Sequence, residues 1–142
     1  MKRYAVFALL FFSVALSAGA ACHNPPPFPN PKVALLSKGP DGAFTRYWFT
    51  VSNRALYSNI LFTASPALPP CGLNTSASRT WLRIYDENGK YLYGYCALSN
   101  NTQMARLSFA VPSGSVQPKR FYITLEDRLC GRTVKSNLVV IP

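Results

Sequence analysis

One histidine and five carboxylates are available in this chain of 142 residues for a hydrolytic or metal-dependent site. His23 stands in a proline-rich segment outside the expected core, whereas a Ser-His-Asp triad needs a histidine that its surroundings hold in place. The carboxylates include two adjacent pairs, Asp86 with Glu87 and Glu126 with Asp127. Neighbouring side chains point to opposite sides of a strand or lie in a turn, so neither pair predicts the converging carboxylates of a glycosidase. We expect no enzyme activity, no metal and no cofactor, and a secreted hydrolase is the least favoured function.

The four cysteines contain no C-x-x-C pair, and their even number predicts two disulfides. Loops that are separated by an even number of antiparallel strands lie at one end of a sandwich, so Cys71, Cys96 and Cys130 should cluster. Three expected strands separate Cys22 from Cys71, which by the same rule places Cys22 at the opposite end. An extended segment of nine residues can span about 28 Å, so Cys22 can return along the domain to the other cysteines. We expect Cys71 to pair with Cys96 and Cys22 with Cys130, although the spacing also allows Cys96 with Cys130.

Aromatic residues stand on both sides of a turn at residues 86–90 (DENGK). A type I turn with Gly89 in the left-handed conformation places Leu82, Ile84, Leu92 and Gly94 on one face. The opposite face then carries the candidate binding surface, which consists of Trp81, Arg83, Tyr85, Tyr91, Tyr93 and Tyr95. A two-residue Asn-Gly turn would instead group the three tyrosines of residues 91–95 with the aliphatic side chains. We favour the first register because it segregates pure aliphatics for a core.

This aromatic surface has two interpretations. Its rings could form a platform for sugar rings or for another protein, with Arg83 as a polar anchor. The alternative is that it forms a second core face or lies beneath the proline-rich segment, because large exposed apolar patches are unusual on soluble monomers.

The first twenty residues have the pattern of a cleaved export signal. Lys2 and Arg3 are followed by an apolar run over residues 4–16 and by a small-residue site, Ala18-Gly19-Ala20. Removing the signal leaves 122 residues and lowers the formal charge from +10 to +8. We expect a secreted or periplasmic protein without a transmembrane span in the mature chain. A lipid anchor on Cys22 is the alternative, although a branched aliphatic residue is usual at the position of Gly19.

The mature chain divides into a proline-rich tether, residues 21–31, and a β-sandwich domain, residues 32–142. Short runs of β-branched and aromatic residues between turn-forming clusters predict strands near 33–36, 44–51, 59–64, 80–85, 91–97, 106–111, 121–126 and 134–141. No segment has a sustained helical period. The fold class is therefore all-β, a single antiparallel sandwich of seven or eight strands stapled by disulfides.

The C-terminal region resembles a known family at the level of the fold. Residues 121–127 (FYITLED) alternate in polarity, a short turn (RLCGR) follows, and residues 136–140 (SNLVV) end the chain's last apolar run. This pattern resembles the last hairpin of a fibronectin type III or related immunoglobulin-like domain. The resemblance implies an immunoglobulin-like sandwich and carries no function with it.

The basic residues are spread along the chain without a long run, so the sequence does not predict specific nucleic-acid binding. For an exported protein, the expected partners are proteins or polysaccharides, including anionic components of the envelope. We expect a non-catalytic binding or structural module of the cell envelope or extracellular space. An inhibitor or effector that acts on another protein through a loop is the alternative. The oligomeric state is left open.

Overall fold

A computed structural model describes residues 22–64, 68, 69, 71 and 77–142 of the chain. The expected export signal lies outside the described residues.

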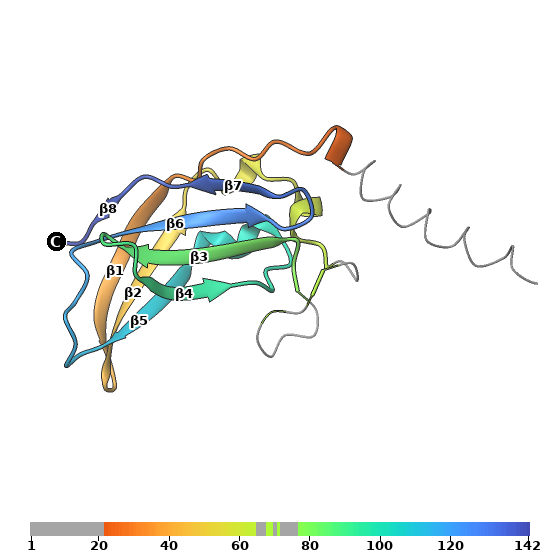
Figure 1. The fold of residues 1–142 in the computed structure, drawn as a ribbon. Coiled ribbons are helices and arrows are strands. Elements are labelled where there is room, and N and C mark those ends of the chain that lie inside the picture. Colours follow the sequence, from red (N-terminus) through yellow and green to blue (C-terminus); the bar gives the residue numbers. More distant parts are fainter. Residues whose placement is uncertain (1–21, 65–67, 70, 72–76) are drawn as a thin grey trace, which may run out of the picture.

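Eight strands form two antiparallel sheets that pack face to face (Figure 1). One sheet has the order β1-β2-β5, and the other has the order β4-β3-β6-β7 with β8 also paired to β6. The strands are β1 (Val33–Asp41), β2 (Phe44–Val51), β3 (Thr80–Asp86), β4 (Tyr91–Tyr95), β5 (Leu107–Pro112), β6 (Arg120–Asp127), β7 (Arg132–Lys135) and β8 (Val139–Val140). Three short 3-10 helices are η1 (Arg54–Leu56), η2 (Asn59–Phe62) and η3 (Asn101–Ala105). The all-β, disulfide-stapled sandwich that the sequence predicts is confirmed.

The core between the sheets follows from side chains that alternate along each strand. Phe121, Ile123 and Leu125 of β6 all point inward and are fully buried. The ring of Phe121 lies 5.4 Å from Phe49 of β2 and 5.1 Å from Phe109 of β5, measured between ring centroids. The intervening residues of each strand therefore form two outer faces, one on each sheet.

The turn between β3 and β4 has the predicted conformation at its glycine. Gly89 has a φ of +80°, a region that side chains with a Cβ rarely adopt, and its N–H donates to the carbonyl of Asp86 at 3.1 Å. The Asp86 carboxylate accepts from the backbone N–H of Asn88 at 2.8 Å and of Lys90 at 2.9 Å. This carboxylate therefore serves the turn.

The strand expected over residues 59–64 is wrong, because most of this segment forms η2. Leu61 and Phe62 are adjacent and both buried, an arrangement that a strand with alternating sides does not provide. The Ser58 side chain accepts from the N–H of Ile60, and Thr80 Oγ1 donates to the carbonyl of Leu61 at 2.7 Å. Side-chain hydrogen bonds thus replace the strand ladder here.

The single strand expected over residues 134–141 is also wrong, because the chain forms two strands, β7 and β8, with a break between them. Within the break, Ser136 Oγ accepts from the N–H of Ile123 at 2.9 Å. The Asn137 side chain accepts from the N–H of Val33 at 2.8 Å and donates to its carbonyl at 2.9 Å. Asn137 therefore joins β1 of one sheet to the last strands of the other.

Both expected disulfides are present, Cys22–Cys130 and Cys71–Cys96, with Cα–Cα distances of 5.5 and 6.4 Å. Because residues 59–64 are not a strand, two strands rather than three separate Cys22 from Cys71. The even-number rule then applies to Cys22 without a returning tether. The disulfide also contradicts the lipid alternative, since a sulfur bonded to Cys130 cannot carry a thioether-linked lipid.

Residues 22–31, the N-terminal strap, run along the β7 edge of the sandwich without joining a sheet, as the prolines predict (Figure 1). The carbonyl of Pro26 accepts from Arg132 at 2.8 Å, and that of Pro29 accepts from Tyr57 Oη at 2.6 Å. Asn30 donates to the carbonyl of Lys135 at 2.9 Å. These contacts fasten the strap to β7 and to the region of η1, away from the aromatic residues of β3 and β4.

Candidate binding face

The six residues of the predicted binding surface do not all share one face. Arg83 pairs with Gly94 and Tyr85 with Tyr91, but a register shift between these pairs leaves Leu92 as an extra residue in β4. The outer face of the sheet therefore carries Trp81, Arg83, Tyr85 and Tyr91, as the sequence predicts. The predicted placement of Tyr93 and Tyr95 on that face is wrong, because the β-bulge at Leu92 reverses the alternation beyond it.

Tyr93 and Tyr95 stand opposite the core residues Ile84 and Leu82 on the inner side of β4. Because β4 is an edge strand, both rings lie at the open side of the sandwich and border a groove of about 630 Å³ between β4 and η3. Tyr95 Oη donates to the carbonyl of Ser108 at 2.6 Å and accepts from its N–H at 3.0 Å. Tyr95 thus protects part of the edge of β5, while Tyr93 remains half exposed.

Residues of β6 and β7 that the sequence-based surface lacked complete the outer face. Tyr122, Thr124 and Glu126 of β6 alternate with the buried core residues of that strand. The resulting cation–aromatic face consists of Trp81, Arg83, Tyr85, Tyr91, Arg120, Tyr122, Glu126, Arg128 and Lys135. The alternation of residues 120–126 could have predicted which side chains of this strand point outward. The sequence could not show that β6 pairs with β3, because that pairing joins distant parts of the chain.

The aromatic rings of this face are mostly covered, and cations lie over two of them. The guanidinium carbon of Arg83 is 3.9 Å, and that of Arg128 is 5.4 Å, from the centroid of the Trp81 ring. The Lys135 ammonium is 4.0 Å from the centroid of the Tyr122 ring. A cation held against an aromatic ring keeps N–H donors for a ligand, so the outer surface offers positive groups more than bare rings.

Arg128 has one buried guanidinium nitrogen, Nη1, without a hydrogen-bond partner in the described residues. Its Nη2 donates to the carbonyl of Pro69 at 2.7 Å. Because the guanidinium lies over the Trp81 ring, the negative π face of the indole offers electrostatic compensation to this group.

The remaining two rings extend the aromatic layer. Tyr85 stacks on Tyr122 at 5.3 Å between centroids and meets the ring of Tyr91 edge-on at 5.9 Å. Tyr91 is 51% exposed, which makes it the most accessible ring of the face. Burial raises the pKa of the Tyr91 hydroxyl and the nearby Arg83 charge opposes this, with the net result above the ordinary value. The hydroxyl therefore keeps its proton at neutral pH.

The charge of the face is strongly positive. Its four cations, Arg83, Arg120, Arg128 and Lys135, stand against one carboxylate, Glu126, which forms an ion pair with Arg83. The other four carboxylates of the chain are engaged elsewhere: Asp41 pairs with Arg46, Asp127 lies in the core, Asp86 serves the turn, and Glu87 accepts from the backbone N–H groups of Lys119 and Arg120. The face therefore has a net charge of +3.

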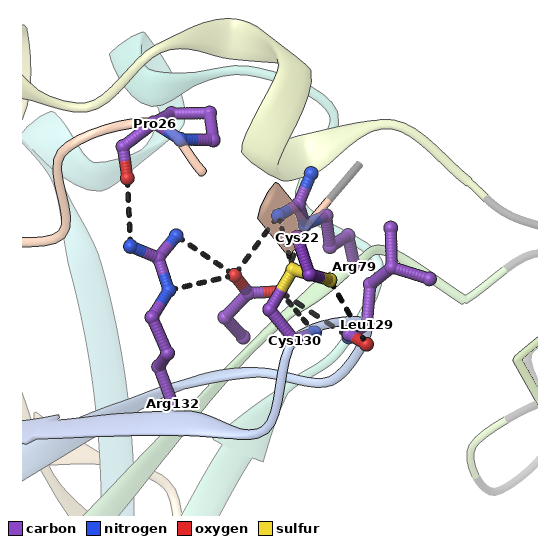
Figure 2. Close-up of a disulfide and its surroundings, with 7 residues drawn as sticks. Cys22, Pro26, Arg79, Leu129, Cys130 and Arg132 are labelled. Carbon is purple, nitrogen blue, oxygen red and sulfur yellow. Dashed lines mark hydrogen bonds and ion pairs between the residues drawn. A yellow bond between two sulfur atoms is a disulfide. The ribbon is translucent and has the colours of Figure 1, made fainter. Parts of the chain in front are cut away.

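Beneath one end of this face lies a buried ion-pair cluster next to the Cys22–Cys130 disulfide (Figure 2). Asp127 is fully buried and accepts from Arg79 Nε at 2.8 Å and Nη2 at 3.0 Å, and from Arg132 Nη2 at 2.8 Å. Arg79 Nη2 also lies 3.1 Å from Cys130 Sγ. Because these contacts join the start of β3, the end of β6 and the start of β7, they fix the strands that carry the face.

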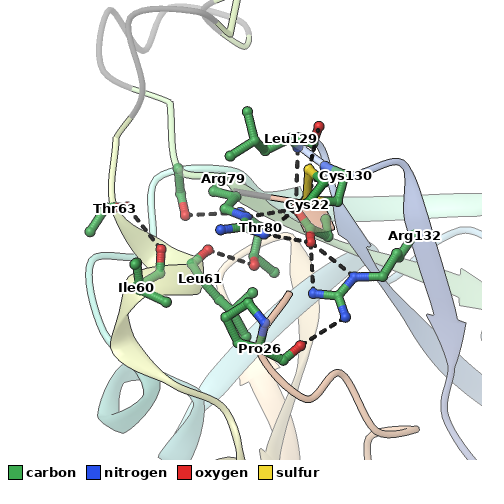
Figure 3. Close-up of polar contacts among 12 residues, drawn as sticks. Cys22, Pro26, Ile60, Leu61, Thr63, Arg79, Thr80, Leu129, Cys130 and Arg132 are labelled. Carbon is green, nitrogen blue, oxygen red and sulfur yellow. Dashed lines mark hydrogen bonds and ion pairs between the residues drawn. A yellow bond between two sulfur atoms is a disulfide. The ribbon is translucent and has the colours of Figure 1, made fainter. Parts of the chain in front are cut away.

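The cluster continues toward η2 through the backbone (Figure 3). The N–H of Arg79 donates to the carbonyl of Thr63 at 3.0 Å, beside the Thr80–Leu61 hydrogen bond. Burial on its own would raise the pKa of Asp127, but hydrogen bonds from Arg79 and Arg132 outweigh it and leave this pKa below its ordinary value. Asp127 is therefore a charged structural group at neutral pH.

The other sheet presents a related but different outer face, the Trp48 face, formed by Phe44, Arg46, Trp48, Arg106 and Ser108. The guanidinium carbons of Arg106 and Arg46 lie 4.3 and 5.9 Å from the centroid of the Trp48 ring. Arg46 is held by Asp41 at 2.7 Å and by Ser108 Oγ at 2.9 Å. This face therefore offers one unpaired cation, Arg106.

No family model and no curated protein matches the chain. None of the helices in the described part of the chain has the length and hydropathy of a membrane span. Within those same residues, no three His, Cys, Asp or Glu side chains gather where they could hold a metal ion.

Proposed function

We propose that this chain is an exported, non-catalytic binding module of the cell envelope or extracellular space that binds an acidic partner on its cation–aromatic face. The observation that carries the proposal is the charge of that face, four cations against one carboxylate, with Arg83, Arg128 and Lys135 held over aromatic rings. Charge of one sign on a rigid sheet attracts and orients an anionic partner.

Export is supported by the two disulfides, which persist in oxidising compartments, together with the signal pattern of the first twenty residues. A non-catalytic role is supported by the carboxylates, each of which takes part in an ion pair or accepts backbone hydrogen bonds.

We also infer membership of the immunoglobulin-like class of sandwiches. If the strands are lettered in chain order with β4 as C′ and β5 as E, the two sheets read A-B-E and C′-C-F-G. This order differs from the constant-type arrangement, A-B-E-D over C-F-G, in having the fourth strand join the opposite sheet.

The mature chain, residues 21–142, should be tested against polygalacturonate, poly-L-glutamate and neutral dextran at several salt concentrations. We expect binding to at least one acidic polymer, weakening as salt screens the charges, and no binding to dextran. Equal binding to dextran, or binding to none of the polymers, would overturn the proposal.

A matched pair of variants locates the site. The double variant Arg83→Gln/Lys135→Gln should weaken binding about tenfold or more, whereas Arg46→Gln/Arg106→Gln on the Trp48 face should change it less than about twofold. Both variants remove two charges, so equal losses would show that binding follows net charge and not this face.

A second candidate function, an effector that acts on another protein, is favoured by the edge of β4. β1 carries Lys38, Pro40 and a bulge, β7 has four residues with two cations, and Tyr95 covers part of β5. β4 has no charged residue, so it is the edge best suited to pair with an extended segment of a partner. Peptides selected from a displayed random library for binding to this chain should bind the Tyr93→Lys variant much more weakly. Unchanged binding to this variant would contradict this candidate.

A further inference from the structure

The Tyr91 side chain lies along β4 toward Gly94 on the cation–aromatic face. The bulge at Leu92 places residues 91 and 94 on the same side of the strand, which regular alternation would not do. A Cβ added to Gly94 would lie 2.5 Å from Tyr91 Oη and 3.1 Å from Trp81 Nε1. The missing side chain of Gly94 therefore leaves room for both the tyrosine hydroxyl and the indole N–H beside this backbone position.

These groups offer three kinds of contact within a small area. The Tyr91 ring is half exposed, so it can pack against an apolar surface. Tyr91 Oη and Trp81 Nε1 make no hydrogen bond to another described residue, and neither is among the fully buried polar atoms without a partner, so both keep hydrogen-bonding capacity for a ligand. Arg83 lies over the Trp81 ring and uses Nη1 for Glu126, which leaves further N–H donors for an anion.

The face continues from this place in one direction across the sheet. The register aligns Gly94 of β4, Arg83 of β3, Thr124 of β6 and Lys135 of β7 in a single row. With neighbouring strands about 4.8 Å apart, the row extends about 14 Å and has a cation at its far end. A linear ligand with repeated negative groups can follow this row without entering a cleft.

We propose that Tyr91, Trp81 and Arg83 form a subsite for one residue of an acidic polysaccharide, a polyuronate. The C–H face of the sugar packs on the Tyr91 ring, a sugar hydroxyl accepts from Trp81 Nε1, and the carboxylate is bound by Arg83. The chain of sugars continues along the row toward Lys135. This inference rests on the proposed function and names the chemical class of its partner.

The alternative partner, an acidic polypeptide, fits these groups less well. Its carboxylates would find the same cations, but it has no regular apolar ring face to pack on Tyr91. Protein interfaces also have a fully buried apolar centre. The row from Gly94 to Lys135 contains a glycine, an arginine, a threonine and a lysine, and no aliphatic side chain to form such a centre.

The test compares two probes with equal charge, hexagalacturonate and hexaglutamate, by calorimetric titration of the mature chain. We expect hexagalacturonate to bind about tenfold more tightly, because its rings add packing on Tyr91 to the shared charge contacts. Equal affinity, or tighter binding of hexaglutamate, would overturn the subsite and leave the proposed function standing. If neither probe binds and the acidic polymers do not bind either, the proposed function fails as well.

Two tyrosines of the same strand provide the matched variants. Tyr91→Ala should bring the affinity for hexagalacturonate down to that for hexaglutamate, while Tyr93→Ala, which is equally exposed but faces the other side, should change it less than about twofold. Tyr91→Phe keeps the ring and should retain most of the affinity. Thermal unfolding checks that each variant is folded. A Tyr91→Phe loss as large as that of Tyr91→Ala, or equal losses for Tyr91→Ala and Tyr93→Ala, would contradict the ring-packing model.

Discussion

The cation–aromatic face and the Trp48 face are built from similar components but differ in charge and in the extent of their aromatic layer. Each has a tryptophan with two arginines near its ring, on the outer side of a sheet. On the Trp48 face, Arg46 is held by an exposed carboxylate, Asp41, and one unpaired arginine remains. On the cation–aromatic face, Arg83 is likewise paired with Glu126, but three further cations remain and the aromatic layer extends to three tyrosines. The two faces therefore differ in their excess of positive charge and in the extent of their aromatic layer, and not in having a cation next to a ring.

The two faces also differ in what anchors them. The cation–aromatic face stands on strands that are joined by the buried cluster of Arg79, Asp127 and Arg132 and by the Cys22–Cys130 disulfide. The ion pair of the Trp48 face, Arg46 with Asp41, is exposed to solvent. Substitutions in the buried cluster should therefore lower the free energy of unfolding much more than substitutions in the exposed ion pair.

The largest effect is expected from Asp127→Asn. Removing the charge of a buried carboxylate leaves Arg79 without a matched partner, so the free energy of unfolding should fall by about 3–5 kcal/mol. The control, Asp41→Asn, breaks an exposed pair and should cost less than about 1 kcal/mol. Urea denaturation at neutral pH measures both. Similar losses for the two variants would refute the difference between the anchors.

Next in size is the loss of the disulfide at the same end. The variant Cys22→Ala/Cys130→Ala should lower the free energy of unfolding by about 2–4 kcal/mol, because the crosslink closes a long loop in the unfolded chain. Hydrogen exchange should show the added opening at the strap and at β6 and β7 rather than at β2 and β5. Exchange that rises uniformly in both sheets would contradict a local anchor.

A smaller effect is expected from acid. Since the pKa of Asp127 is lowered in the folded state, its contribution to stability is present above the ordinary aspartate pKa of about 3.9 and is lost as pH falls through the folded value. Unfolding free energies measured between pH 7 and pH 2 should therefore decline below about pH 4. The decline in unfolding free energy with falling pH should be shallower for Asp127→Asn than for the unmodified chain. An identical slope in the two proteins would show that Asp127 does not cause the decline.

The smallest effect compares the two tryptophans. Trp81→Ala removes the ring that holds Arg83 and Arg128 and the indole N–H of the proposed subsite, so binding of polygalacturonate should weaken about fivefold, the size of one lost hydrogen bond. Trp48→Ala removes the equivalent ring from the other face and should leave binding nearly unchanged. If Trp48→Ala has the larger effect, the assignment of the binding face is reversed.

The sequence by itself determined the features that depend on neighbouring residues, namely most strands and the turn between β3 and β4. Alternating polarity marked most strands, and the Asn-Gly dipeptide after Asp86 marked a turn that needs a left-handed glycine. Strand parity also predicted that Cys71, Cys96 and Cys130 lie at one end, although it left their pairing open and the expected strand count did not bring Cys22 to that end. These inferences succeeded because the responsible residues are close together in the chain or obey the general geometry of antiparallel sheets.

Tertiary structure decided the rest. Leu61 and Phe62 have the composition of a strand, but both are buried and the Leu61 carbonyl accepts from Thr80 Oγ1, which favours a 3-10 helix. The bulge at Leu92 moved Tyr93 and Tyr95 to the inner side of β4, because a single extra residue reverses every side chain beyond it. Likewise, Tyr122 and Lys135 joined the cation–aromatic face only because β6 lies beside β3 and β7 lies beside β6. Local sequence set which residues alternate, and the packing of distant strands set which of them meet.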